Sequence, residues 1–128
     1  MKTYLGASHH ELERAREVMT FLELAGHTIT YDWTQAFKDP VKDYLKYARA
    51  DIAGVYSADV VVLLFENPHP YRGTHTELGL AIAFRKPVII LGKEADKNIF
   101  SRLENVSICY QLKDVLTLLD ELEKGDPE

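Results

Sequence analysis

Residues 59–65 have the sequence DVVVLLF, in which a single aspartate is followed by an unbroken run of apolar side chains. A strand with one face in water alternates polar and apolar residues, whereas a strand covered by helices on both faces is apolar throughout. The run is far shorter than the roughly 20 residues that a membrane-spanning helix needs. We therefore interpret it as the central strand of a parallel sheet.

On both sides of this run, strand-like and helix-like patterns alternate along the chain. Further strands are predicted at residues 2–7, 27–33, 87–91 and 106–110, and helices at residues 8–26, 41–57, 74–84 and 112–122, with a helical turn near 97–103. Such alternation predicts an α/β three-layer sandwich with a five-stranded parallel sheet. The default strand order is the flavodoxin-like (Rossmann-like) 2-1-3-4-5, in which ligands bind beyond the carboxyl ends of strands 1 and 3.

The helix predicted at 41–57 has apolar residues at three- and four-residue spacing. This spacing is typical of a helix face that packs against a sheet. We expect the inner side to be formed by Tyr44, Leu45, Ala48, Ile52 and Val55.

The size and composition of the chain narrow the classes of function. Its 128 residues suit one domain, expected at 1–124 with a frayed tail at 125–128. A formal net charge of −5 disfavours binding to polymeric nucleic acid, which is a polyanion. The single cysteine, Cys109, lies in an apolar run and is predicted to be a buried structural thiol. The sequence shows no leader and no membrane-spanning run, which favours a cytoplasmic protein.

Residues that follow strands 1, 2 and 3 are expected to meet at one edge of the sheet, because parallel strands all end there. Asp51, in the middle of the second helix, can project towards the same edge. The candidate site residues are Tyr4, Gly6, Ser8, Trp33, Asp51, Asn67, Gly73, Thr74 and Glu77.

Two helix starts carry the pattern of a capping box, Ser8 with Glu11 and Thr74 with Glu77. In this interpretation both glutamates only stabilise their helices. Glu77 has a second interpretation, because a carboxylate at the switch point could attack C1′ of a sugar and form a covalent glycosyl intermediate. A helix N-terminus would favour the ionised form that such a nucleophile needs.

The ordered motifs resemble the nucleoside 2-deoxyribosyltransferase family over most of the chain. TYLGA at residues 3–7 is similar to the opening strand of the family. DIAGV at 51–55 and SADVV at 57–61 resemble its central aspartate and the start of its third strand. GTHTELG at 73–79 resembles the family signature G-T-x-x-E-L-G, and the similarity continues through 81–88.

The resemblance implies roles for three side chains. Glu77 matches the nucleophilic glutamate, Tyr4 the tyrosine whose hydroxyl orients that carboxylate, and Asp51 an aspartate that contacts the substrate. Some family members have another aspartate about six residues before the glutamate, which helps to handle the base; here that position is Tyr71. The implied activity is transfer of the sugar to another base or to water, with a role in nucleotide salvage. The resemblance also implies that no metal or cofactor is needed and that the protein forms a homodimer or a higher homo-oligomer.

A related branch hydrolyses 2′-deoxynucleoside 5′-monophosphates, which requires a phosphate pocket. Ser8, His9, His10 and Arg72 could form one together with helix amides. Alternatively, Ser8 is only a cap and the two histidines are solvated. Trp33 is interpreted either as a rim aromatic or as a platform on which a base stacks.

Two other functions fit the same pattern. One is a glutamate-dependent NAD glycohydrolase similar to TIR domains, which shares the N-glycosidic chemistry. The other is a noncatalytic nucleotide-binding module in which Glu77 is only a cap. The sequence lacks the glycine-rich and serine motifs of NTPases, dinucleotide oxidoreductases and α/β-hydrolases.

Overall fold

A computed structural model describes residues 1–125 of the chain, so most of the expected tail, at 126–128, lies outside the described residues. The strands are β1 (Lys2–Gly6), β2 (Thr28–Ile29), β3 (Val60–Leu64), β4 (Val88–Leu91) and β5 (Val106–Cys109). The helices are α1 (Leu12–Leu24), α2 (Tyr44–Ser57), α3 (Arg72–Ala83) and α4 (Leu112–Lys124). Short 3₁₀ turns are η1 (His9–Glu11), η2 (Trp33–Lys38), η3 (Lys93–Lys97) and η4 (Ile99–Arg102). Within residues 1–125, no helix is both long and apolar enough to span a membrane.

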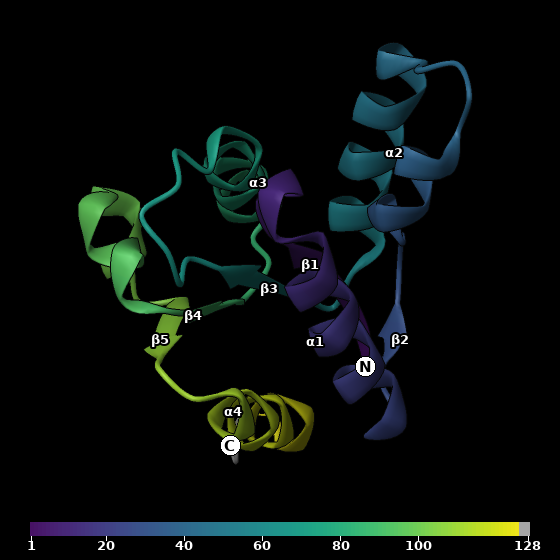
Figure 1. Ribbon diagram of the computed structural model, residues 1–128. Helices are drawn as coiled ribbons and strands as arrows, with labels where there is room; N and C mark the ends of the chain where they lie inside the picture. Colours follow the sequence, from purple (N-terminus) through teal and green to yellow (C-terminus); the bar gives the residue numbers. More distant parts are fainter. Residues whose placement is uncertain (126–128) are drawn as a thin grey trace.

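The five strands form one parallel sheet in the order β2-β1-β3-β4-β5, which confirms the predicted topology. The register places Gly6 of β1 opposite Leu63 of β3. Every residue of β3 is buried, as the apolar run predicted. Figure 1 shows this sheet between two helical layers.

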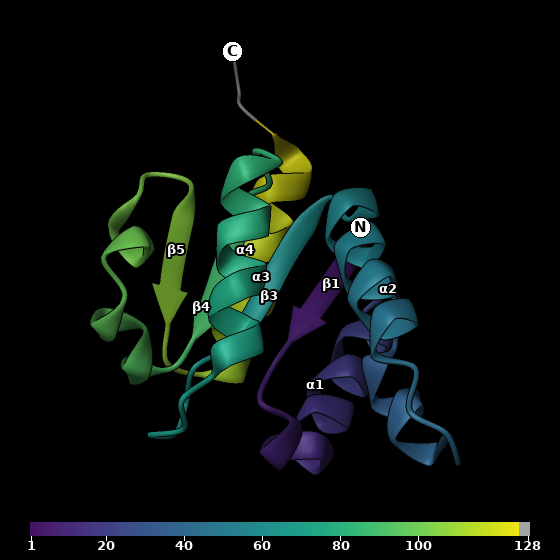
Figure 2. The same ribbon diagram turned by 90° about the horizontal axis from the view of Figure 1, so that it is seen from above.

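Each face of the sheet is covered by one pair of helices. On one face, α1 and α4 pack on Leu5, Val62 and their neighbours in the strands. On the other face, α2 and α3 cover a second cluster that includes Tyr4 and Leu63. Helix α1, which connects β1 to β2, thus crosses one face of the sheet, and α2, which connects β2 to β3, crosses the other face. The crossovers diverge at the carboxyl edge between β1 and β3, and a crevice opens there. In Figure 2 the arrowheads of β1 and β5 point to this edge, from which α1 and α3 begin.

The second strand is shorter than the predicted span of 27–33. Only Thr28 and Ile29 pair with β1, which is the single neighbour of β2 at the edge of the sheet. The chain then leaves the sheet, and the side chain of Asp32 accepts a hydrogen bond from the amide of Thr34 at 3.0 Å, which caps η2. The residues that follow β2 are therefore free to fold over the crevice.

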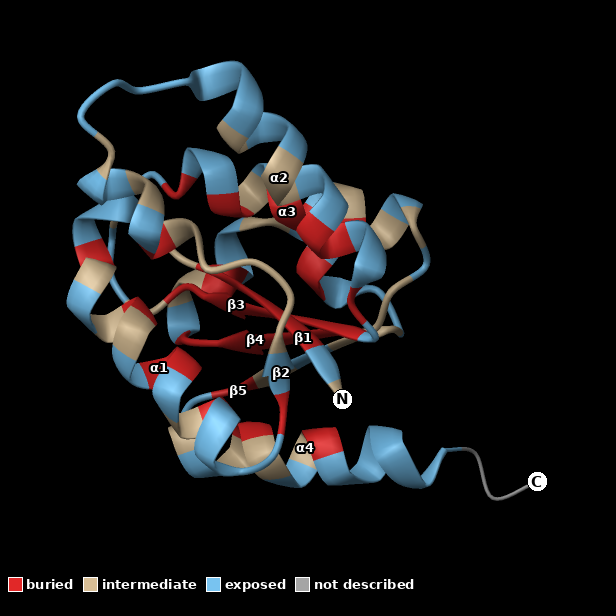
Figure 3. Cartoon of the chain, turned by 90° about the vertical axis from the view of Figure 1, so that its right-hand side faces the viewer, coloured by how far each residue is buried: buried red, intermediate tan, exposed pale blue. Residues whose placement is uncertain are grey.

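The prediction for the inner face of α2 is mostly wrong. Val55 is fully buried, but Tyr44, Leu45 and Ile52 are 76%, 61% and 44% exposed. Figure 3 shows the outer side of this helix as almost continuously exposed. The helix has apolar residues on two sides, and periodicity does not distinguish a side that meets the core from one that does not.

The lone cysteine is buried, as predicted. Cys109 ends β5 and packs in the same core cluster as α1 and α4. Burial raises the pKa of its thiol to about 11, so the unreactive protonated form prevails near neutral pH.

Candidate functional site

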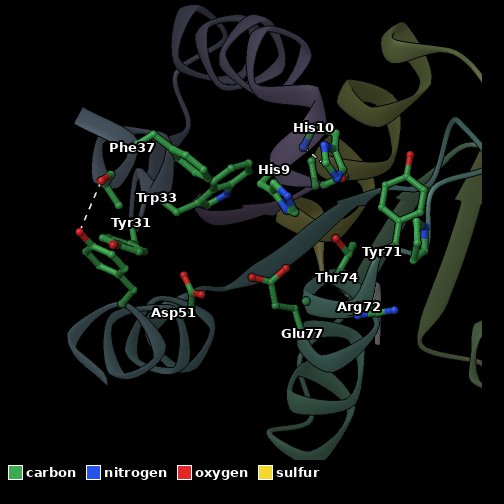
Figure 4. Close-up of a pocket in the computed structure, with 16 residues that line it drawn as sticks. His9, His10, Tyr31, Trp33, Phe37, Asp51, Tyr71, Arg72, Thr74 and Glu77 are labelled. Carbon is green, nitrogen blue, oxygen red and sulfur yellow. Dashed lines mark hydrogen bonds between the residues drawn. The ribbon is translucent and has the colours of Figure 1, made fainter. Parts of the chain in front are cut away.

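A cavity of about 490 Å³ opens at the carboxyl edge of the sheet, at the predicted switch point. This volume is in the range of small-molecule binding sites. Figure 4 shows the cavity with Glu77 near its middle. Its lining comes from four segments, with Ala7, Ser8, His9, His10, Tyr31, Trp33, Ala36, Phe37, Tyr47, Asp51, Pro70, Tyr71, Arg72, Gly73, Thr74 and Glu77.

Three chemically reactive side chains from three elements meet at this cavity. Tyr4, from β1, is fully buried, and its hydroxyl donates a hydrogen bond to Oε2 of Glu77, from α3. The same hydroxyl lies 3.3 Å from Oδ1 of Asp51, from α2. Since a tyrosine hydroxyl has one proton, it can donate to only one carboxyl group at a time. Tyr4 therefore links the two acids that line the cavity.

Two glycines let the three elements approach closely enough for this arrangement. A Cβ at Gly6 would overlap Oε1 of Glu77, so only glycine leaves room for the carboxylate beside β1. A Cβ at Gly54 would lie 3.0 Å from the ring of Tyr4. Gly54 therefore allows α2 to pack tightly on β1, and Asp51 lies one turn earlier on the same helix.

The two predicted capping boxes are absent. Helix α3 begins at Arg72, with Tyr71 rather than Thr74 at the N-cap, so Glu77 lies in its second turn. Ser8 does cap η1, where its Oγ accepts a hydrogen bond from the amide of His10, but Glu11 reaches across to another loop. The cap interpretation of Glu77 is thus wrong, and its carboxylate is instead directed towards Tyr4.

Burial, rather than the helix dipole, dominates the charge state of the carboxyl groups. Glu77 is only 8% exposed, and burial raises its pKa to about 8. The hydrogen bond from Tyr4 lowers this pKa, and the charge of Asp51 raises it. Burial also raises the pKa of Asp51. Near neutral pH, the pair therefore holds a proton that ordinary surface carboxylates would have lost.

One end of the cavity is aromatic. The indole N–H of Trp33 donates a hydrogen bond of 2.7 Å to the carbonyl oxygen of Leu5, which fixes the ring at the end of β1. Phe37 lies edge-on to Trp33, with ring centroids 6.2 Å apart. Tyr31 also lines this end. Tyr47 lines the cavity too, and its hydroxyl donates to the carbonyl oxygen of Ala36, next to Phe37. A flat heterocycle can stack on such a surface.

The opposite end is polar and cationic. It is lined by Ser8 and His10 near the start of η1 and by Arg72 and Thr74 from the start of α3. His9 lies between the two ends, with its ring stacked on that of Phe37 at a centroid distance of 6.3 Å. The Thr74 hydroxyl is buried and has no hydrogen-bond partner among the described residues. The first amides of α3 have no partner within the helix, and they favour an anion. Within residues 1–125, no group of three His, Cys, Asp or Glu side chains is placed to hold a metal ion.

The structure places most of the predicted site residues at the cavity. Ser8, Trp33, Asp51, Gly73, Thr74 and Glu77 line it, and Tyr4 and Gly6 lie directly behind Glu77. Asn67 is not among the lining residues, and its amide donates to Glu11 instead. Sequence reasoning missed the aromatic contribution of Tyr31, Phe37 and Tyr47. The aromatic residues at positions 31, 33 and 37 are a signal for this end, but the predicted strand at 27–33 includes the first two of them, whereas in the structure β2 ends at Ile29.

Solved structures with this fold include three that cover nearly all of the chain. BlsM aligns with a TM-score of 0.66 and 19% identity, over 93% of this chain and 86% of its own. The CMP N-glycosidase BcmB of Clostridium botulinum aligns with a TM-score of 0.65 and 21% identity, over 94% and 99%. A conserved protein of Enterococcus faecalis V583 aligns with a TM-score of 0.64 and 16% identity, over 95% and 99%. At these identities, the similarity establishes the shared fold.

No curated protein matches the chain significantly in sequence. The sequence model of one family does match, over residues 3–113. That span includes the three converging side chains Tyr4, Asp51 and Glu77, together with every segment that lines the cavity. The chain therefore belongs to the nucleoside 2-deoxyribosyltransferase family, whose enzymes act on small nucleoside substrates.

Proposed function

We propose that this protein cleaves the N-glycosidic bond of a nucleoside 5′-monophosphate through a covalent intermediate on Glu77. The order of groups along the cavity carries the proposal. The aromatic end fits a base, with Asp51 beside it; Glu77 lies in the middle, beside the position of a sugar; and the cationic end fits a phosphate. BcmB, which shares the fold, is a CMP N-glycosidase, and this similarity supports a monophosphate substrate.

In the proposed first step, an oxygen of Glu77 bonds to C1′ as the C1′–N bond breaks and its electron pair moves to the base. Asp51 donates the proton that lets the base leave as a neutral species. This step needs Glu77 ionised and Asp51 protonated. The Tyr4 hydroxyl touches both groups, so it can accept the proton of Glu77 while passing its own to Asp51.

In the second step, Asp51, now ionised, accepts a proton from water while the water oxygen attacks C1′. The ester bond to Glu77 breaks, and its electron pair returns to the carboxylate. Another base in place of water would give sugar transfer. The same residues support either outcome, so the acceptor is part of the test.

The experiment is chromatography of the protein incubated with ribo- and deoxynucleosides, their 5′-monophosphates and NAD, each with and without free adenine. We expect free base and a sugar 5-phosphate from the monophosphates. Protein quenched during turnover should carry the mass of that sugar phosphate on the peptide that contains Glu77. Release of nicotinamide from NAD alone would favour the NAD glycohydrolase. Ligand-induced thermal stabilisation without product, equal in Glu77→Ala, would favour a binding module.

We also propose that the outer face of α2 is an interface between two copies of the chain. Tyr44, Leu45, Ile52 and Tyr56 are all large, apolar and at least 44% exposed on this one helix. A small protein rarely leaves such a group uncovered. The same helix supplies Asp51 to the cavity, so a second copy would lie next to the site.

A further inference from the structure

Glu11 is a buried carboxylate that lies behind the cavity rather than in its lining. It is the last residue of η1, and its side chain is 6% exposed. Its Oε2 accepts a hydrogen bond of 3.0 Å from the hydroxyl of Tyr71 and another from the side-chain amide of Asn67. Nε2 of His69 lies 3.9 Å from the same oxygen. Glu11 thus connects the start of the chain to the loop between β3 and α3.

Tyr71 completes this connection from the other side. Its hydroxyl donates to Glu11 and accepts a hydrogen bond of 3.1 Å from the amide of Asn67. Its backbone adopts a left-handed conformation, with φ of 51°, immediately before the first turn of α3. A bulky aromatic residue rarely adopts this conformation, and it persists only where surrounding contacts fix it. The contacts with Glu11 and Asn67 supply that constraint on Tyr71, which is 3% exposed.

The two segments joined by Glu11 and Tyr71 are those that line the cationic end of the cavity. His10 directly precedes Glu11 and Ser8 lies three residues before it, while Arg72 directly follows Tyr71 and Thr74 lies three residues after it. A phosphate bound there would contact both segments, so its affinity depends on the distance between them. The sugar and base would contact other parts of the cavity. The connection therefore acts on the phosphate end, and of its two members only Tyr71 is itself part of the cavity lining.

We infer that Glu11 and Tyr71 are positioning residues that hold the two phosphate-contacting segments at a fixed spacing and thereby set the preference for a 5′-monophosphate over a nucleoside. The inference rests on the proposed function for the identity of the substrate. Neither residue needs to touch the reacting atoms. A glutamine at this position keeps a side-chain oxygen that can accept the same two hydrogen bonds without the negative charge.

A neighbouring ion pair offers a matched control. Arg14 donates from Nε and Nη2 to the two carboxylate oxygens of Glu66, with both distances 2.9 Å. This pair also ties α1 to the loop after β3, but it joins the loop at its beginning and not beside Arg72. Loss of Arg14 should loosen the loop in general without changing the spacing of the phosphate end.

The test compares kcat and KM for a 5′-monophosphate and its nucleoside in Glu11→Ala, Glu11→Gln, Tyr71→Phe and Arg14→Gln. For Glu11→Ala and Tyr71→Phe, we expect KM for the monophosphate to rise about tenfold, the effect of losing roughly one hydrogen bond. KM for the nucleoside should stay unchanged, and Glu11→Gln should restore the wild-type values. Equal changes for both substrates, or the same selective change in Arg14→Gln, would show a merely structural role and overturn the inference.

A binding measurement separates failure of this inference from failure of the proposed function. If the wild type releases no base, the proposed function is wrong, and calorimetric titration with inorganic phosphate replaces the kinetics. Weaker binding of phosphate in Tyr71→Phe than in wild type and Arg14→Gln would still support the spacing role. No binding by the wild type, or equal binding by all variants, would contradict it. Tyr71→Phe keeps the test valid if Glu11→Ala does not fold.

Discussion

The backbone of Gly6 lies so close to the carboxylate of Glu77 that any side chain at position 6 would overlap Oε1 of Glu77. The backbone of β1 therefore makes a close steric contact with the carboxylate and limits the positions that it can occupy. Tyr4, two residues earlier on the same strand, holds the other carboxylate oxygen. The position of Glu77 is thus fixed from β1 rather than from its own helix.

We expect Gly6→Ala to reduce kcat about 100-fold, because displacement of a catalytic group by an ångström has an effect of that order. Thermal denaturation should still show a cooperative transition. Gly79→Ala is the matched control, since a Cβ at this exposed position of α3 meets nothing within 4 Å. Alanine there should leave kcat unchanged and slightly stabilise the helix. Wild-type activity in Gly6→Ala would show that close packing of the Glu77 carboxylate against position 6 is not required for catalysis.

The activity should decline as the pH rises through about 8, the pKa of Glu77. Above that pH, the pair of Asp51 and Glu77 loses the proton that the leaving base requires. In Tyr4→Phe, the decline should move to higher pH, because the hydrogen bond from Tyr4 lowers the pKa of Glu77. The measurement is the pH dependence of kcat for both proteins. A decline at the same pH in the variant would disprove the role of Tyr4 in the titration.

Glu77→Gln should be more stable than wild type at pH 8.5 and close to it at pH 4. The pKa of Glu77 rises from an ordinary value of 4.5 to about 8 on folding, so the unfolded chain loses its proton first. Between these values, the free energy of unfolding of the wild type falls with pH, by at most about 1.4 kcal/mol per pH unit. Glutamine does not titrate and avoids this loss. Chemical denaturation at several pH values tests the difference, and parallel curves for the two proteins would contradict it.

Arg72→Ala should raise KM for the monophosphate about tenfold, with little change in KM for the nucleoside, because an arginine–phosphate contact is a charge-assisted hydrogen bond. Arg72 lines the cationic end of the cavity. Arg102→Ala removes an exposed arginine from η4 and serves as the control for net charge. Equal effects of the two variants would indicate long-range electrostatics instead of a phosphate contact.

Leu45→Asp should reduce the mass of the particle measured by sedimentation or light scattering to that of one chain. Leu45 is 61% exposed on the outer face of α2, where a charge would oppose burial in an interface. The control is Leu24→Asp, at the end of α1, which is 85% exposed and lies away from this face. A wild-type protein that sediments as a monomer would disprove the interface.

The sequence was sufficient to predict the strand order and the convergence of Tyr4, Asp51 and Glu77 at one edge of the sheet. Both follow from local patterns, because an apolar run such as 59–65 identifies a central strand and parallel strands end at one edge. The topology then brings distant positions together without any knowledge of side-chain contacts.

The remaining errors come from contacts between residues that are far apart in the chain. Glu11 has the sequence of a capping residue, but its partner Tyr71 lies 60 positions away. Tyr44 and Leu45 share the spacing of core residues, yet they are exposed. The local sequence indicates that a residue could pack in a core or cap a helix. Which residue it actually contacts is determined by the packing of the whole chain.

Cys109 has a practical consequence for following ligand binding in solution. It is the only cysteine, it is buried, and its raised thiol pKa slows reaction with maleimides and similar reagents. A cysteine introduced at Phe37, which is half exposed at the aromatic end of the cavity, would therefore be labelled selectively by a fluorophore. The natural chain is thus already a suitable background for single-site labelling, with no native thiol to remove.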